Sequence, residues 1–192
     1  SVVLYCSFYF LNEMILETED LRLRPTELED LELFFAWERD PDVTRFFSIG
    51  DDQSREEVYC KYFNDLQDTA VRQFTICLKG YDADTVIGRV VISDIIEGWK
   101  AEIWRIYIGD TNLRGNGYGR QAMEAMLKYC FTELSLERLY LDHYTGNPAR
   151  QLYLKLGFKP EGCLRKNCRK NGVLYDVHLL SMLREEYLSL NL

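Results

Sequence analysis

The feature that most constrains this chain is a glycine-rich turn, Arg114-Gly115-Asn116-Gly117-Tyr118-Gly119-Arg120, between a strand-like run and a helix-like run. The strand pattern covers residues 102–108, and the helix pattern covers residues 118–134. The start of a helix leaves backbone N–H groups without partners and carries a partial positive charge, and glycines let an anion approach those groups closely. The turn therefore predicts a binding site for a phosphorylated cofactor.

The spacing of the turn discriminates between phosphate-binding motifs. A P-loop needs Lys followed by Ser or Thr, whereas Gly119 is followed by Arg120 and Gln121. A dinucleotide-binding motif, which would indicate an oxidoreductase, needs G-x-G-x-x-G near the start of a βαβ unit, whereas these glycines are spaced G-x-G-x-G past mid-chain. Through Arg114, Gly117 and Gly119 the turn instead resembles R/Q-x-x-G-x-G/A, the pyrophosphate-binding signature of the GNAT superfamily of acyl-CoA-dependent N-acyltransferases.

A second segment resembles the other GNAT signature, an asparagine followed by a helix with Y-x-K-x-G-F. Tyr153, Lys155, Gly157 and Phe158 match it. Asn147 stands six residues before Tyr153, where family members usually have seven. Either the helix starts one residue later or Asn147 does not make the usual cofactor contact. The opening residues 21–25 and the closing residues 182–187 resemble the RimJ/RimL-type branch, which contains ribosomal-protein N-terminal acetyltransferases and spermidine N-acetyltransferases.

The resemblance implies an α/β (α+β) fold, the GNAT fold, with a central mixed, mostly antiparallel sheet of about seven strands flanked by four helices. Two capping boxes, residues 26–29 and 54–57, predict helices over residues 27–39 and 55–66. Strand patterns and an Asn-Gly hairpin turn predict strands at residues 73–78, 86–92, 102–108, 138–144, 158–169 and 173–183.

A length of 192 residues with 47% hydrophobic content suits one buried core, so we expect a single domain over residues 14–192. Residues 1–13 are an apolar N-terminal extension that we expect either to be non-native, to add a strand or to cover a partner subunit, which leaves a homodimer open.

Periodicity predicts which side chains are buried. A period of two places Glu102, Trp104, Ile106 and Ile108 on one face of their strand. A helical stripe is predicted for Ala122, Met126, Tyr129, Cys130 and Leu134. Cys60, Cys77 and Cys130 lie in apolar patterns and are expected to be buried thiols, which indicates a reducing, cytoplasmic location.

The net charge of −8, from 23 basic and 31 acidic residues, argues against nucleic acid as a partner and would suit a cationic amine. A negative net charge can also serve only to keep a protein soluble, so the charge by itself does not identify the substrate. The six cysteines form no CxxC pairs and have no nearby histidines, so we expect no metal site. We also expect no membrane partner.

The resemblance implies roles for individual residues toward acetyl-CoA. The backbone of Ile106, Tyr107 and Ile108 would run beside the pantetheine arm. The backbone amides of Gly115, Asn116, Gly117, Tyr118 and Gly119 would donate to the pyrophosphate. Arg114 and Arg120 would add positive charge, and Asn147 would make a further contact with the cofactor.

Acetyl transfer to an amine needs a base for the ammonium proton and an acid for the departing thiolate. We expect Glu102 to be the base, with a pKa raised by partial burial, and His143 or Asp94 as rival bases. The match to Y-x-K-x-G-F makes Tyr153 the expected acid. Aromatic side chains that could wall the acceptor pocket are Trp37, Phe46, Phe47, Trp99 and Trp104.

The sequence thus predicts an acetyl-CoA-dependent N-acetyltransferase acting by direct attack of a primary amine, either a protein N-terminus or a small amine such as a polyamine. The alternative is a non-catalytic module that binds or senses acyl-CoA. The acceptor follows no short motif and is left open.

Overall fold

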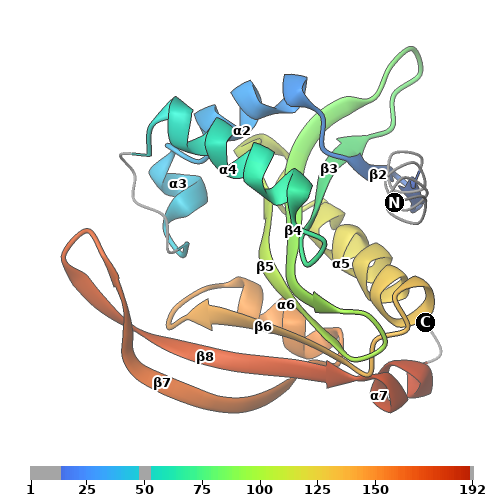
Figure 1. Cartoon of the computed structure of the whole chain (residues 1–192), viewed down its shortest axis with the longest axis vertical. Coiled ribbons are helices and arrows are strands. Elements are labelled where there is room, and N and C mark those ends of the chain that lie inside the picture. The colour runs from blue at the N-terminus through green and yellow to red at the C-terminus, as the bar shows by residue number, and fades with distance from the viewer. Residues whose placement is uncertain (1–13, 48–52, 191–192) are drawn as a thin grey trace.

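The computed structural model describes residues 14–47 and 53–190, so the proposed roles of residues 1–13 lie outside the described residues. The described chain forms one eight-stranded sheet in the order β1-β2-β3-β4-β5-β6-β8-β7 (Figure 1). The strands are β1 (Leu16–Glu17), β2 (Leu21–Pro25), β3 (Arg72–Leu78), β4 (Thr85–Ile96), β5 (Lys100–Ile108), β6 (Arg138–Tyr144), β7 (Lys159–Lys170) and β8 (Val173–Leu183).

The α-helices are α2 (Leu31–Trp37), α3 (Pro41–Thr44), α4 (Arg55–Gln67), α5 (Tyr118–Lys128), α6 (Ala149–Lys155) and α7 (Arg184–Ser189). The predicted α/β fold with a mixed, mostly antiparallel sheet is confirmed, and the short elements β1, α3 and α7 are additions to it. The predicted helix over residues 118–134 continues from α5 into a π-helical turn, Tyr129–Glu133. No helix of the described residues combines the length and apolarity needed to cross a membrane.

The β5 and β6 strands are parallel, and they pair over three residues before they separate. The pairs are Lys100 with Arg138, Ala101 with Leu139 and Glu102 with Tyr140. Beyond Glu102 the two strands diverge, as Figure 1 shows. Residues 103–108 are therefore paired with β4 on one side and have no strand partner on the other. This leaves part of the β5 backbone edge available to a ligand.

A β-bulge at Trp104 reverses the faces of β5 after Glu102. The adjacent β4 residues Val91 and Ile92 pair with Arg105 and Ile103 of β5, respectively. Trp104, between the two β5 residues, has no partner and is therefore an extra residue. The prediction that Glu102, Trp104, Ile106 and Ile108 share one face is wrong. An inserted residue shifts the period-two alternation by one position, which turns Ile106 and Ile108 toward the α5 core and leaves Glu102 on the opposite face.

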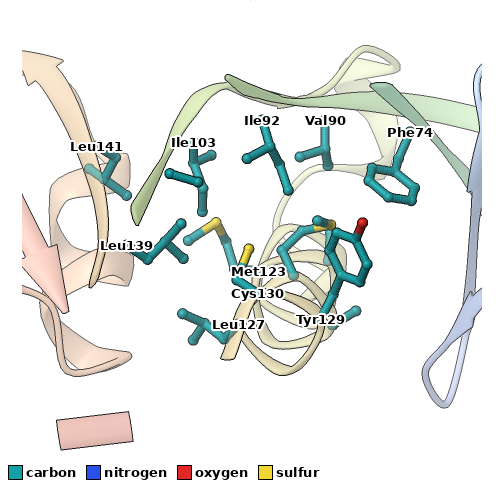
Figure 2. Packing of buried hydrophobic residues seen from close by; sticks show 14 of the residues in the cluster. Phe74, Val90, Ile92, Ile103, Met123, Leu127, Tyr129, Cys130, Leu139 and Leu141 are labelled. Carbon is teal, nitrogen blue, oxygen red and sulfur yellow. The ribbon is translucent and has the colours of Figure 1, made fainter. Parts of the chain in front are cut away.

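The main core lies between the sheet and α5. Figure 2 shows side chains of β3 to β6, among them Phe74, Ile92 and Leu141, packed on Met123 and Leu127 of α5. The predicted helical stripe is confirmed, because each of its five members is at most 9% exposed. Of the cysteines predicted to be buried, Cys77 and Cys130 are buried and Cys60 is exposed.

Two helix starts test the predicted capping boxes. The box at residues 54–57 is confirmed, since Glu57 N–H donates to Ser54 Oγ (3.2 Å) and Ser54 N–H donates to Glu57 Oε2 (2.6 Å). The box at residues 26–29 is shifted by one residue, because the N–H of Glu27 donates to Asp30 (2.9 Å). Thr26 is instead buried under the sheet, where it accepts a hydrogen bond from Thr75.

The opposite face of the sheet carries a buried charged cluster that the sequence patterns did not indicate. Glu38, at the end of α2, is 1% exposed. Its Oε1 accepts hydrogen bonds from Arg89 (2.7 Å) and Tyr107 (3.0 Å) and lies 2.7 Å from Arg105 Nη1. Burial alone would disfavour the ionised carboxyl, but the two guanidinium groups outweigh it and hold the pKa of Glu38 below its ordinary value. The cluster therefore ties α2 to β4 and to the bulged part of β5.

We expect Glu38→Ala to lower the free energy of unfolding by about 3–5 kcal/mol, because it leaves two buried guanidinium groups without their counter-charge. Chemical denaturation measures this change. The control is Glu32→Ala on the same helix, which removes a half-exposed ion pair with Arg55 and should cost about 1 kcal/mol or less. Equal losses in the two variants would contradict the importance of the cluster.

Candidate active site

The glycine turn leaves a row of backbone donors open. Gly117 caps α5 with a φ of 85°, and Gly115 has a φ of 86°, a left-handed conformation that favours glycine. None of the N–H groups of residues 115–120 donates to an acceptor of the described chain. A Cβ at Gly115, Gly117 or Gly119 would meet no protein atom within 4 Å. The turn can therefore surround an anionic group with N–H donors.

The two arginines beside the turn are partly engaged by the protein itself. Arg114 donates to the carbonyl oxygens of Ile108 (3.3 Å) and Asp42 (3.1 Å). Arg120 forms a surface ion pair with Glu124 (2.8 Å) one turn along α5. Both charges lie near the open donors, and Arg114 also links the turn to the end of β5.

The predicted pantetheine-binding residues lie on the unpaired edge of β5. Tyr107 is buried against Glu38, and Ile106 and Ile108 pack against the α5 core. Their side chains therefore point away from the gap between β5 and β6, and their backbone faces it. The hydrogen bond from Arg114 to the carbonyl oxygen of Ile108 links the turn to the end of this edge.

Glu102 lies where β5 and β6 begin to separate. Its half-buried carboxylate accepts a weak hydrogen bond from Ser93 Oγ (3.4 Å). Burial raises the pKa of Glu102 above its ordinary value, and the negative charges of Asp142 and Asp94 raise it further. A carboxyl group with a raised pKa is better matched to accept a proton near neutral pH.

Asp142 is a site residue that the sequence reasoning missed. It follows Tyr140, the partner of Glu102, by two positions on β6, so both lie on the face that also carries Glu102. Partial burial by neighbouring protein atoms raises the pKa of Asp142 above its ordinary value, although its side chain still reaches solvent. The alternation of polar and apolar residues along 140–142 was visible, but local patterns do not reveal which strand lies alongside.

Asp94 is a poor rival to Glu102 as a base. It accepts hydrogen bonds from Lys100 Nζ and from the hydroxyl of Tyr140, both at 2.5 Å. The hydrogen bond from Lys100, followed by that from Tyr140, lowers the pKa of Asp94 below its ordinary value. The proton affinity of Asp94 is thus lowered, whereas that of Glu102 is raised.

Tyr153 lies on α6 and is 7% exposed. Burial raises its pKa to about 12, with a further contribution from the charge of Asp142. Its hydroxyl forms no hydrogen bond with the described chain, and it is not among the polar atoms that are both closed off from solvent and unpaired. The phenol is therefore protonated at neutral pH and free to donate.

His143 lies on the other face of β6 from Asp142. The ring is buried, 6.5 Å from the Tyr153 ring and stacked on His178 at 5.1 Å. Burial lowers the pKa of His143, so its imidazole is neutral at physiological pH. The structure groups this rival base with Tyr153 and not with Glu102.

Asn147 starts the α6 segment. Its Oδ1 accepts a hydrogen bond from Ala149 N–H (2.9 Å), and α6 begins at Ala149. The side-chain oxygen is therefore used within the turn before the helix, whereas the side-chain nitrogen, Nδ2, makes no hydrogen bond with the described chain.

The aromatic residues predicted to wall the acceptor pocket do not form one group. Trp37 and Phe47 contact Tyr107 at 6.3 and 5.6 Å. Trp104 lies between Lys61 and Arg105, and Trp99 is 56% exposed beside Lys100. Phe46 lies near Gly146, beyond the end of β6.

A separate hollow of about 900 Å³ lies between the end of α4, the loop before β3 and residues 24–29. It contains none of the predicted site residues. We place the candidate active site in the gap between β5 and β6 because Glu102 lies at one end of the unpaired β5 edge and the open amide donors follow its other end. The described residues contain no group of three His, Cys, Asp or Glu side chains arranged to hold a metal ion.

Comparison with known proteins agrees with this geometry. A profile of the acetyltransferase (GNAT) domain family matches residues 20–159. The chain is 34% identical to the uncharacterized N-acetyltransferase p20 of Bacillus licheniformis, over 90% of this chain and 97% of that protein. It is 29% identical to the spermidine N(1)-acetyltransferase of Vibrio cholerae, over 88% and 96% of the two chains.

A solved structure of spermidine N-acetyltransferase from Vibrio cholerae, in complex with CoA and spermine, superposes with a TM-score of 0.81 at 28% identity. The match covers 89% of this chain and 99% of that one.

Because the negative charge of Asp142 helps to raise the pKa of Glu102, we expect Asp142→Asn to lower it. If Glu102 must be ionised for the reaction, the acidic limb of the pH profile of kcat/KM then moves to lower pH. The shift should shrink as salt is added, because screening weakens the interaction of a solvent-accessible charge.

The control is Asp82→Asn, which removes the same charge from the exposed turn between β3 and β4. A limb that stays in place in Asp142→Asn, or moves equally in the control, would contradict the assignment of the limb to Glu102.

Proposed function

Because the chain belongs to the GNAT acetyltransferase family, we propose that it acetylates a primary amine of a small polycationic amine, a polyamine-like acceptor, by direct attack. The observation that carries the choice of acceptor is the acidic face beside the gap, where the negative charges of Asp142 and Asp94 both act on Glu102, and the Lys100 ammonium is paired with Asp94. A cation with several separated charges suits this face, because one amino group can approach Glu102 while another interacts with Asp142.

The donor is acetyl-CoA, and when bound it supplies an acetyl group activated as a thioester. The fit rests on the unpaired N–H groups of residues 115–120, which can donate hydrogen bonds to the oxygens of a diphosphate, and on glycines that leave room for it. The unpaired edge of residues 106–108 offers backbone groups to the extended arm that follows. Asn147 keeps its side-chain nitrogen as a further donor to the cofactor.

An aliphatic amine with a pKa of about 10 is protonated at neutral pH and cannot attack until it loses a proton. We assign this task to the carboxylate of Glu102, whose raised pKa makes it a more effective acceptor. The phenolic oxygen of Tyr153 holds the proton that the departing thiolate needs. The neutral, buried His143 packs beside Tyr153 and supports its ring.

The alternative acceptor is a protein N-terminus, as in the RimJ/RimL-type branch. A peptide carries one α-amino group and a bulky chain, and nothing in the acidic face favours it over a polyamine. The alternative of a non-catalytic acyl-CoA-binding module accounts for the glycine turn but leaves the raised pKa of Glu102 unused.

We also infer a cytoplasmic location, since the cysteines of the described residues are free thiols, as in a reducing compartment. Assembly as a homodimer remains a prediction, to be tested by comparing the molecular mass of the full chain with that of a chain lacking residues 1–13.

Release of free CoA tests the proposed function. Protein, acetyl-CoA and one amine are incubated, and thiol is measured with a colorimetric reagent. We expect release with spermidine or 1,4-diaminobutane and slow release with a peptide that carries a free N-terminus. Preference for the peptide would overturn the choice of acceptor, and CoA binding without release for any amine would favour the non-catalytic module.

Gly119→Ala tests the glycine turn. Gly119 lies in the first turn of α5 with open space around it, so alanine should fit and should raise stability by about 0.5–1 kcal/mol. The added methyl group would lie where we place the pyrophosphate, so the Kd for CoA should rise at least about tenfold, a loss of about 1.4 kcal/mol. Calorimetric titration measures the affinity.

The matched control is Gly162→Ala on β7, which also faces open space. Unchanged CoA affinity in a stable Gly119→Ala variant would contradict the assigned cofactor position.

Tyr153→Phe tests the acid. Loss of the phenolic proton should lower kcat at least about tenfold with little effect on the KM for acetyl-CoA. Because the pKa of Tyr153 is raised to about 12, loss of activity through deprotonation of this group should be half complete only near that pH and negligible near neutral pH. An unaltered kcat in Tyr153→Phe would refute the assignment.

A further inference from the structure

The start of α5, which carries open amides of the glycine turn, is tied to the opening of the described chain by one side chain, Gln121. Its Oε1 accepts hydrogen bonds from the hydroxyl of Thr18 (2.7 Å) and from the N–H of Asp20 (3.1 Å). Its Nε2 donates to Asp20 Oδ2 (2.7 Å). Both polar atoms of the Gln121 side chain are therefore engaged by the turn between β1 and β2, which we call the 18–20 turn.

The 18–20 turn is itself held on the sheet by hydrogen bonds. The N–H of Thr18 donates to the carbonyl oxygen of Leu21 (2.9 Å), and the N–H of Leu21 donates back to the Thr18 hydroxyl (3.0 Å). Lys79, just after β3, donates from its N–H to the carbonyl oxygen of Asp20 (2.9 Å) and from its ammonium to that of Thr18 (2.6 Å). The turn therefore offers Gln121 partners that are fixed relative to the sheet.

Gln121 differs from the other side chains of α5. Among the described residues, it is the only member of that helix whose side chain hydrogen-bonds outside the helix, since Arg120 pairs with Glu124 of α5 and the stripe that packs on the sheet is apolar. Apolar contacts are non-directional, whereas a hydrogen bond weakens as its angle departs from linearity. The contacts of Gln121 therefore constrain the rotation and direction of the helix start, one residue after the last open amide.

We propose that Gln121, held by the 18–20 turn, aims the open amides of residues 115–120 and so sets the affinity for the diphosphate of CoA. A helix start binds an anion through the N–H groups that point at it. Gln121 is a positioning residue, because its polar atoms are engaged by Thr18 and Asp20 and it acts through the helix. The inference rests on the proposed function, with its diphosphate at the glycine turn, and adds a determinant of cofactor affinity outside that turn.

The test compares acetyl-CoA with S-acetylpantetheine, which presents the same thioester without a diphosphate. Gln121→Met keeps the approximate length of the side chain and removes both polar atoms. We expect the Kd for CoA, measured by calorimetric titration, and the KM for acetyl-CoA to rise at least about fivefold, with kcat nearly unchanged. The kcat/KM for S-acetylpantetheine should stay within about twofold of the wild-type value, because this donor does not use the amides.

Thr18→Val removes the hydroxyl from the other side of the contact and should also raise the Kd for CoA. It carries the same comparison of donors if Gln121→Met folds poorly. Because both substitutions break one interaction, their effects in the double variant should be less than additive. The matched control is Gln151→Met, which removes the same side-chain amide from an exposed position on α6 and should leave the Kd at the wild-type value.

Equal CoA affinity in Gln121→Met and wild-type protein overturns the inference. An equal loss with both donors also overturns it, since the effect would then not arise at the diphosphate. Binding of CoA needs no acceptor, so wild-type enzyme that acetylates no amine overturns the proposed function, while the comparison of Kd values still decides the role of Gln121.

Discussion

The structure depends most on the way β5 is held in a bulged path. The extra residue at Trp104 would be unfavourable in an isolated strand pair, because it leaves a position without a ladder partner. Arg105 and Tyr107, which follow the bulge, are both bound to the buried carboxylate of Glu38. Two buried cations, Arg89 of β4 and Arg105, and a phenol thus converge on one anion, and moving β5 by one residue would break the contacts that Arg105 and Tyr107 make with it.

This constraint shapes the site. With the bulge in place, the residues before it direct Glu102 to the acidic face, and the residues after it bury Ile106 and Ile108 in the α5 core. The β5 edge that faces β6 then exposes backbone groups in place of side chains. The two ends of the resulting path differ in charge: open N–H donors lie at the start of α5, and Glu102 and Asp142 lie at the other end. This difference in charge suits the proposed pairing of an anionic donor at one end with a cationic acceptor at the other.

Sequence patterns predicted those elements whose conformation is specified by residues close together in the chain. The glycine turn, the hairpin at Asn171-Gly172 and the buried stripe of α5 are each specified by residues within a few positions of one another. The same reasoning failed at Trp104, because a bulge is decided by the partner strand and by Glu38. It also failed at the first capping box, where Thr26 is drawn beneath the sheet by Thr75 and Asp30 becomes the capping acid.

The sequence by itself determined the family resemblance, the anion-binding turn and the candidacy of Glu102 and Tyr153, since these rest on short spacings within single elements. Tertiary structure alone decided that Asp142 joins Glu102, that His143 belongs with Tyr153, and that Gln121 reaches Thr18. The physical reason is that a strand or turn encodes its own conformation locally, whereas charges and rings interact across space. Which of them become neighbours follows from sheet order and register, and these are set by the packing of the whole core.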